Sequence, residues 1–302
     1  MDSAVRTESP GDGALRTHPS GLRNALTVDV EDYFQVSAFA GTISRQSWDD
    51  WPRRIERNMA ILLELFAERG LQVTFFILGW IAERYPQLVR RIVDAGHELA
   101  SHGYDHQRVT ALDAKSFRVD VERAKGILED CSGVHVIGYR APSFSINERT
   151  PWAVDCLLET GHRYSSSVYP IAHDHYGSPR ASRWPFQPRP GSGFLELPVA
   201  TARFAGRNWP AAGGGYFRLL PYGISRWSLR RINQREVRSF IFYLHPWEID
   251  PEQPRPADLP ARTRFRHYVN LHRMQPRLER LLADFHWDRI DRIFLESPRR
   301  LG

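Results

Sequence analysis

Three carboxylates lie close together near the start of the chain, in the segment TVDVEDYF. Asp29, Glu31 and Asp32 come at the carboxyl end of an apolar run, residues 26–30, that predicts a β-strand. Alternation along a strand places Asp29 and Glu31 on one face, and Asp32 joins them only if the chain has already turned. Carboxylates this close raise one another's pKa unless a cation neutralises them. The cluster therefore indicates a metal site or, alternatively, a helix cap or a solvated strand end.

Two histidines four residues apart form the second candidate group. His102 and His106 lie in SHGYDH, directly after the strand predicted at 97–101. A helical turn would bring such side chains together, and neutral imidazole is the commonest metal-binding side chain. Two histidines and one carboxylate leave open positions on a metal ion, as a catalytic site requires. A surface helix also produces this spacing by chance, so the pair alone is a weak indication.

Two further polar residues end predicted strands. Arg140 follows the strand predicted at 136–139, and His245 ends the apolar segment 240–245. A permanently charged arginine at a strand end either pairs with a carboxylate or binds an anion. The histidine is either a packed, hydrogen-bonded residue or an acid–base group. Because α/β barrels form their sites at the carboxyl ends of the strands, the four groups are expected to share one active site.

The elements that must position these groups alternate between short β-rich runs and longer segments of helical period. This rhythm predicts stacked βα units around a parallel sheet or barrel. The predicted strands are 26–30, 71–78, 97–101, 136–139, 194–199 and 240–245. The predicted helices run from Pro52 to before Gly70, from Pro86 to before Gly96, over 113–131 and over 147–160.

Two irregular segments, 169–190 and the glycine triplet 213–215, interrupt this rhythm and predict loops over a site. The tail over 262–285 predicts helical packing, interrupted near Pro276. Several aromatic residues could stack on a ligand or simply pack, namely Tyr169, Tyr176, Trp184, Trp209 and Tyr216. One domain over 24–302, with a C-terminal extension from about residue 170, is more economical than two domains.

Composition excludes several classes of protein. The 302 residues are 42% hydrophobic and 25% charged, which is typical of a soluble globular chain. The longest apolar stretch, 73–82, is far shorter than the roughly 20 residues of a membrane-spanning helix. The net charge of +6 comes with arginines scattered among acidic residues, which argues against nucleic-acid binding. Cys131 and Cys156 predict buried free thiols, and residues 1–23 predict a disordered leader.

The order of these motifs resembles the polysaccharide deacetylase family with the NodB homology domain, of the carbohydrate esterase family 4 type. The matching segments, in the family's order, are TVDVEDYF, SHGYDH, YRAPSF and YLHP. Later segments resemble the subgroup found with exopolysaccharide and exosortase systems, namely SSSVYP, HDHYGSP, LELPVAT, GGGYFRLLPY and HPWEIDPEQPR. The resemblance covers roughly residues 26–287. It implies an α/β fold, a distorted (β/α)7-type barrel with loop insertions and a C-terminal helical extension.

The resemblance also implies hydrolysis of N-acetyl groups on polymeric amino sugars. The catalytic residues that carry over are Asp29 as general base, Arg140 as the residue that orients it, and His245 as general acid. The residues expected to contact the glycan are Pro142, Tyr169, Tyr216 and Trp247.

A divalent metal ion, held by one carboxylate and two histidines, is a further implication of the resemblance. His102 and His106 are similar in position to the family's histidine ligands. The carboxylate ligand is Glu31 if spacing along the strand decides, or Asp32 if the chain turns after Val30. Such a ligand set accepts zinc, cobalt, nickel or manganese, and zinc is the first expectation.

One departure from the family's pattern concerns Ser165, in the segment YSSS, where related sequences often have aspartate. Serine cannot supply a charged partner for His245 at that corner. Two rival functions therefore stay open. One is a metal-independent amide hydrolase acting on a small ureide-like substrate, and the other is a catalytically silent glycan-binding or assembly protein.

The expected partners are an N-acetylated polysaccharide or oligosaccharide and an exopolysaccharide assembly system, with no nucleic acid. Without an apolar secretory segment or a disulfide framework, the expected location is the cytoplasm, at the inner face of the membrane.

Overall fold

The structure is a computed structural model, and it describes residues 21–173 and 176–295. The predicted leader lies outside these described residues as far as residue 20. Within them, the main sheet has eight parallel strands in the order β10-β1-β2-β3-β4-β5-β6, with β9 also paired to β1. The strands are β1 (Asn24–Val30), β2 (Thr74–Ile77), β3 (Glu98–Ser101), β4 (Gly138–Tyr139), β5 (Tyr164–Ser165), β6 (Leu195–Glu196), β9 (Ile241–Leu244) and β10 (Trp287–Asp288).

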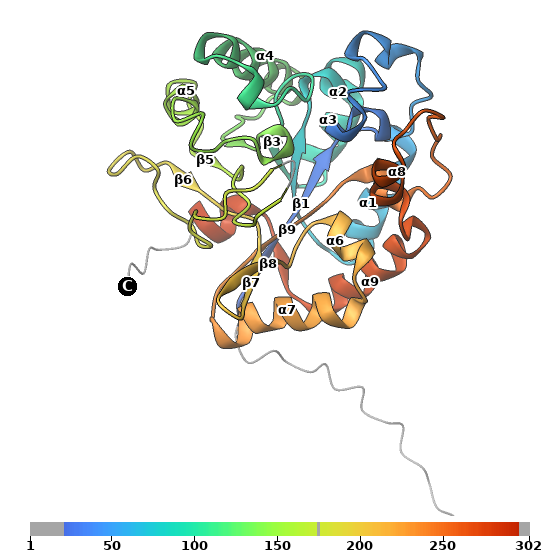
Figure 1. The fold of residues 1–302 in the computed structure, drawn as a ribbon. Coiled ribbons are helices and arrows are strands. Elements are labelled where there is room, and N and C mark those ends of the chain that lie inside the picture. The colour runs from blue at the N-terminus through green and yellow to red at the C-terminus, as the bar shows by residue number, and fades with distance from the viewer. Residues whose placement is uncertain (1–20, 174–175, 296–302) are drawn as a thin grey trace, which may run out of the picture.

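The first strand lies at the centre of this sheet (Figure 1). All seven residues of β1 are buried, as expected for a parallel strand covered on both faces. After β6 the chain crosses back towards β9. Two backbone hydrogen bonds show this: the Val199 amide donates to the Val168 carbonyl (3.1 Å), and the Ala200 amide donates to the Ile241 carbonyl (3.1 Å). The sheet therefore curls into a barrel-like shape, which confirms the predicted α/β barrel fold.

Helices surround the curled sheet (Figure 1). They are α1 (Ile55–Glu68), α2 (Gly79–Arg84), α3 (Pro86–Asp94), α4 (Ala114–Ser132), α5 (Ala153–Glu159), α6 (Gly214–Leu219), α7 (Tyr222–Arg235), α8 (Ala261–Tyr268) and α9 (Met274–Asp284). A separate antiparallel hairpin joins β7 (Thr201–Phe204) to β8 (Arg207–Pro210). Short 3-10 turns lie at Tyr33–Gln35, Ser37–Phe39, Arg45–Asp50, Val109–Ala111, Pro142–Phe144, Pro246–Ile249 and Leu271–Arg273, and a π-helical turn at Asp291–Leu295.

The C-terminal half departs from the sequence expectations in two places. The glycine triplet is not a loop, because α6 begins at Gly214 after Gly213, whose φ is 103°. The break in the tail is not at Pro276, which lies in the first turn of α9, where proline costs no helical hydrogen bond. It lies at Asn270, whose φ of 52° separates α8 from the turn that precedes α9.

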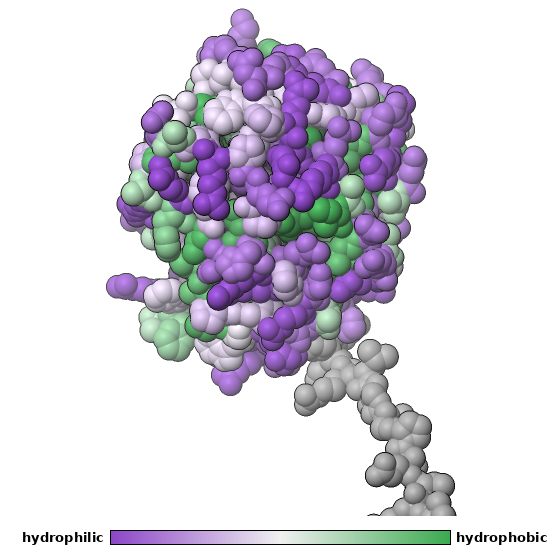
Figure 2. Space-filling model, turned by 90° about the vertical axis from the view of Figure 1, so that its right-hand side faces the viewer, coloured by the Kyte–Doolittle hydropathy of each residue, from purple (hydrophilic) through white to green (hydrophobic). Residues whose placement is uncertain are grey.

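Three further features bear on expectations from the composition: the surface, the helices and the two cysteines. Seen from the right-hand side of Figure 1, hydrophilic residues cover most of the face, and hydrophobic residues gather in a band across its middle (Figure 2). Among the helices of residues 21–173 and 176–295, none has the length and apolar character that a membrane crossing needs. Both cysteines are free thiols, as predicted, but only Cys156 is buried and Cys131 is half-buried.

Candidate active site at the carboxyl ends of the strands

The structure brings the predicted chemical groups to one edge of the sheet. Asp29 lies in β1, and Glu31 follows that strand directly. His102, Arg140 and His245 each follow the last residue of β3, β4 and β9, respectively. Because these strands are parallel, their carboxyl ends meet, and side chains from four separate segments share one buried site.

The Arg140 guanidinium holds the Asp29 carboxylate. Arg140 is fully buried, and its Nη1 donates to Asp29 Oδ1 (2.5 Å) and to Thr27 Oγ1 (2.8 Å). Its Nε and Nη2 donate to the backbone oxygen and the hydroxyl of Ser166 (3.0 and 2.9 Å), and its Cζ lies 4.1 Å from the centre of the Phe76 ring. With its donors committed in this way, the arginine fixes one orientation of the Asp29 carboxylate.

Glu31, His102 and His106 form a group with the geometry of a metal site. One ligand atom from each lies within 4.8 Å of the others, and all three residues are buried. His102 Nδ1 lies 2.8 Å from the Arg140 carbonyl, so the tautomer that donates there leaves Nε2 as a bare acceptor. Glu31 Oε2 is buried and lies 2.8 Å from His106 Nε2, but accepts no well-formed hydrogen bond in the described structure. This donor set fits a divalent ion.

The two histidines do not share a helical turn, which corrects the expectation from their spacing. The segment between them is irregular, and Gly103 (φ 75°) and His106 (φ 58°) both adopt left-handed backbone conformations. The Ser37 hydroxyl lies 3.3 Å from His106 Nδ1. A strained turn and this contact, rather than helical periodicity, bring the His106 ring towards Glu31.

Asp32, the other carboxylate that the sequence left open as a ligand, has different partners. Its Oδ1 accepts from the Tyr33 amide (2.9 Å), and its Oδ2 accepts from the amides of Arg54 (2.7 Å) and Ile55 (3.1 Å), at the start of α1. Burial raises the pKa of Asp32 to about 6. The group with metal-site geometry contains Glu31 and not Asp32, because both oxygens of the Asp32 carboxylate accept backbone hydrogen bonds that cap two helical turns.

The electrostatics of the group suit a cation. Burial would raise the pKa of Glu31, but the contact with His106 and the charges of His245 and His102 outweigh it and lower the pKa to about 2. For His102 the effect of burial is dominant and lowers the pKa of the ring to about 4. At neutral pH the carboxylate is thus ionised and the His102 ring is neutral, which are the forms that bind metal ions.

His245 has a carboxylate partner that the sequence reasoning missed. Glu248 Oε2 accepts from the His245 amide (3.0 Å) and lies 3.3 Å from His245 Nδ1. Arg218 Nε donates to Glu248 Oε1 (2.9 Å), with both residues buried. Burial alone would lower the pKa of His245, but the Glu248 hydrogen bond and the Glu31 and Glu248 charges raise it to about 9. The three-residue spacing in HPWE is a capping-box pattern that could have identified Glu248, whereas Arg218 carries no such signal.

Comparison with known proteins bears on the identity of this site. Residues 43–164 match the family model described as polysaccharide deacetylase. A peptidoglycan deacetylase of Helicobacter pylori is 30% identical over 140 residues, which are 44% of this chain and 47% of that protein. A chitooligosaccharide deacetylase of Sinorhizobium fredii is 35% identical over 142 residues, 46% of this chain and 62% of that protein. These matches show a similarity to polysaccharide deacetylases that covers less than half of this chain.

The same comparisons set the extent of the resemblance. The chain spans about half the length of the curated relatives that it matches. A crystal structure from Mycobacterium smegmatis, also named for the polysaccharide deacetylases, covers 97% of this chain and 98% of its own, with a TM-score of 0.57 and 22% identity. That likeness concerns the fold.

A second family model, described as a domain of unknown function (DUF3473), matches residues 166–295. The polysaccharide deacetylase match contains His102, His106 and Arg140, whereas the DUF3473 match contains His245 and its partner Glu248. The two matched segments therefore contribute residues to one site.

The residues expected to contact a glycan have different placements. Trp247 is buried, donates from Nε1 to Glu31 Oε1 (3.2 Å) and stacks between His245 and His267. Pro142 is buried in the turn that follows Arg140, and Tyr216 is half-buried. Tyr169 is fully buried and its hydroxyl donates to the Ala212 carbonyl (2.5 Å), so its ring belongs to the core and the expected glycan contact is wrong in this geometry.

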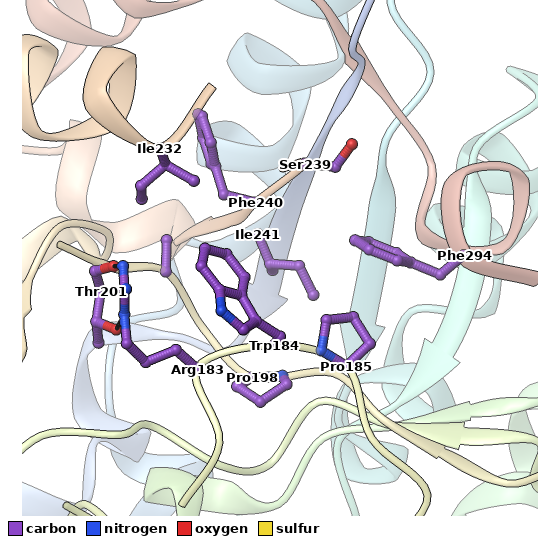
Figure 3. A pocket seen from close by; sticks show the side chains of 11 residues that line it. Arg183, Trp184, Pro185, Pro198, Thr201, Ile232, Ser239, Phe240, Ile241 and Phe294 are labelled. Atoms are coloured by element: carbon purple, nitrogen blue, oxygen red, sulfur yellow. Dashed lines mark hydrogen bonds between the residues drawn. The ribbon is translucent and has the colours of Figure 1, made fainter. Parts of the chain in front are cut away.

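Two tryptophans considered for stacking on a ligand lie away from the candidate active site. Trp184 lines a small cavity together with Ile232, Phe240 and Ile241, at the amino-terminal end of β9 (Figure 3). Trp209 lies in the β7–β8 hairpin and is 55% exposed. Tyr176 is half-buried and stacks on Tyr169 at 6.0 Å between ring centres.

Ser165 is buried and takes part in a chain of hydrogen bonds. Its hydroxyl donates to Ser167 Oγ (2.6 Å), and Ser167 Oγ accepts from the Ala141 amide (2.8 Å). Glu196 Oε1 accepts from the amides of Ser167 and Val168, both at 2.8 Å. Because Glu248 already partners His245, a carboxylate at position 165 is not required for that purpose.

Proposed function

We propose that this protein is a metal-dependent hydrolase that removes N-acetyl groups from the amino sugars of a polysaccharide. The observation that carries the proposal is that a fixed carboxylate, Asp29, and a charged histidine, His245, which lies 3.5 Å from Glu31, occur at one edge of the barrel. The names of the relatives, which include peptidoglycan and chitooligosaccharide deacetylases, support this reaction class.

Glu31, His102 and His106 would hold the divalent ion, for which zinc is the first candidate. When bound, such an ion polarises a carbonyl and lowers the pKa of water, to about 7 in well-tuned zinc sites. The bare acceptor of His102 and the Glu31 oxygen without a well-formed hydrogen bond support this assignment.

The proton transfers fall to the chain's own residues. Asp29 accepts the proton of the attacking water, and Arg140 keeps its carboxylate in one orientation. His245 donates a proton to the departing amine nitrogen, which would otherwise be a poor leaving group. Each such acid–base step is typically worth about 100- to 10,000-fold in rate.

The natural substrate is proposed to be an exopolysaccharide or a peptidoglycan-like glycan that carries N-acetylated amino sugars. The segments that resemble the exopolysaccharide and exosortase subgroup support the first of these, together with action beside a polysaccharide assembly system in the cytoplasm.

The proposal is tested with N-acetylglucosamine oligomers and purified protein, with mass spectrometry to detect deacetylated sugars. We expect deacetylation by the wild type, a loss of at least about 100-fold in Asp29→Asn, and no loss in the control Asp130→Asn, an exposed residue of α4. Binding of the oligomers without any deacetylation would contradict the proposal and favour a silent glycan-binding protein. Hydrolysis of a small ureide alone would favour the other rival.

A further inference from the structure

An exposed aromatic surface lies on the β7–β8 hairpin and the adjoining helix α7. Its members, called here the aromatic face, are Phe204 (59% exposed), Trp209 (55%), Ile224 (48%) and Trp227 (52%). The strand register pairs Ala202 with Trp209 and Phe204 with Arg207, so Phe204 and Trp209 point to the same side of the hairpin. The rings of Phe204 and Trp227 are 6.4 Å apart, and Ile224 lies one helical turn before Trp227. The four side chains thus form one surface.

Arginines surround the aromatic face. Residues 201–238 contain eight arginines, all but the buried Arg218 at least partly exposed, and a single acidic residue, Glu236, which pairs with Arg183 (2.9 Å). Trp227 lines an open groove along α7 with four of these arginines, namely Arg226, Arg230, Arg231 and Arg235. Arg226 and Arg230 share one carboxylate, that of Asp284 (2.8 and 3.2 Å). The surface therefore combines exposed aromatic rings with an excess of positive charge.

The combination of aromatic rings and arginines favours an anionic bilayer over a second copy of the chain as the partner of this surface. A second copy of the chain would bring two arginine-rich surfaces together, which like-charge repulsion opposes. An anionic bilayer surface offers phosphate groups for arginines and an interfacial layer in which tryptophan and phenylalanine side chains lie favourably. The long arginine side chains can pack beside the rings and reach the phosphate level.

The position of this surface is compatible with the proposed reaction. Asn24, at the start of β1, exchanges hydrogen bonds with Asn233 of α7 (2.8 and 3.0 Å). Asp29 lies near the other end of the same seven-residue strand, which spans about 20 Å. Figure 1 shows α7 along the lower edge of the molecule, with β1 running upwards from it. A bilayer at α7 would leave the candidate active site open to a glycan.

We propose that the aromatic face and its arginines attach this protein peripherally to the surface of an anionic lipid bilayer. The attachment needs no membrane-spanning segment, because binding energy comes from partial burial of the rings and from attraction of the arginines to lipid phosphates.

The test is co-sedimentation of the full chain with vesicles at low salt, with phosphatidylglycerol and phosphatidylcholine mixtures compared with phosphatidylcholine alone. We expect binding to the anionic vesicles that weakens as salt is raised. The double variant Phe204→Ala/Trp227→Ala should bind at least about tenfold more weakly, and Arg231→Glu/Arg235→Glu should also lose affinity, about fivefold or more for each charge removed. Phe265→Ala, at a 59% exposed ring of α8, is the matched control and should bind as the wild type does.

Three results would overturn the proposal. These are no binding to anionic vesicles, equal binding by the wild type and the double variant, and a concentration-dependent dimer that the double variant alone abolishes, which would assign the surface to a second copy. Deacetylation of soluble oligomers, measured on the same variants, should be unchanged. Failure of the membrane proposal is thereby distinguished from failure of the proposed function.

Discussion

At the scale of single residues, the site shows how neighbouring carboxylates acquire different roles. Asp29 is held by a buried guanidinium, and Glu31 faces two histidines. Asp32 accepts three backbone hydrogen bonds at the starts of two helical turns. Because the chain turns directly after β1, residues adjacent in sequence face separate surroundings.

The first prediction concerns metal binding by these neighbours. Glu31→Ala should lose at least about 100-fold in zinc affinity, because it removes a ligand atom, whereas Asp32→Asn should keep about one zinc ion per chain. Elemental analysis after dialysis against limiting zinc measures both. Asp32→Asn is expected to lower stability by about 0.5–2 kcal/mol through its weaker cap, so thermal melts confirm that it is folded. Zinc retained by Glu31→Ala and lost by a folded Asp32→Asn would reverse the assignment.

The second prediction concerns pH. Because the pKa of His245 is raised to about 9, its acid form predominates at neutral pH, and kcat/KM should fall as pH rises through that value. Glu248→Gln removes a negative charge that favours the protonated ring, so this alkaline limb should move down by about one pH unit or more.

Rate profiles between pH 6 and 10 measure the shift, with Glu252→Gln as the control, since the Glu252 side chain is 76% exposed. Glu248→Gln also removes the partner of Arg218, which could harm folding, so Glu248→Asp is a second variant. It keeps the negative charge, and its alkaline limb should shift less than that of Glu248→Gln. An unchanged limb in a folded Glu248→Gln would contradict the role of this pair.

At the scale of elements, helix α6 explains why the chain has consecutive glycines there. A Cβ atom on Gly214 would lie 1.6 Å from Glu248 Oε2, and a Cβ on Gly213 would lie 2.6 Å from the Tyr243 ring. Arg218, one turn further along α6, then reaches Glu248. The helix start therefore packs directly against the carboxylate that orients His245.

The third prediction compares two neighbouring glycines of this helix. Gly214→Ala should destabilise the fold by about 1–3 kcal/mol, because the methyl group forces Glu248 to move, and should also lower kcat. A Cβ on Gly215 meets no atom within 4 Å, so Gly215→Ala is the matched control and should be neutral or stabilising by about 0.5–1 kcal/mol. Thermal unfolding measures the stability of both variants. Equal stabilities would contradict the direct packing of Gly214 against Glu248.

The elements that sequence patterns predict well are those with strong apolar signals. The β1, β2, β3 and β9 strands are completely buried, and the residues that follow them could be recognised as a shared site. Strand β5 has only two residues, Tyr164 and Ser165, too few for a pattern. Helix α7 escaped prediction because its buried face includes Ser225, Ser228 and Asn233, which weaken the apolar period.

Site details that depend on three-dimensional packing could not be predicted. The choice between Glu31 and Asp32 depends on where the chain turns, and the burial of Tyr169 depends on which side of a loop meets the core. The sequence contained Glu248 at a recognisable spacing from His245, but only the fold shows Arg218 beside it.

At the scale of the whole molecule, the site combines residues from the first strand with residues from the C-terminal half of the chain. Strand β1, which precedes both family matches, lies beside β9 and β10, which belong to the DUF3473 match. Asp29 and Glu31 are thereby brought opposite His245, more than two hundred residues later in the sequence. This arrangement gives the segment of unknown function a structural part in the site: it supplies strands beside β1 and the proposed acid.

The central claim is that this edge of the barrel is a metal-dependent deacetylase site, and one measurement tests it most directly. Acetate release from N-acetylglucosamine oligomers is followed with purified protein, after removal of metal by a chelator and after return of zinc or cobalt. We predict that release stops on chelation, resumes when metal is returned, and stays absent in Asp29→Asn under both conditions. Acetate release that is unaffected by chelation and by Asp29→Asn, or a zinc-loaded protein that releases no acetate, would contradict this account.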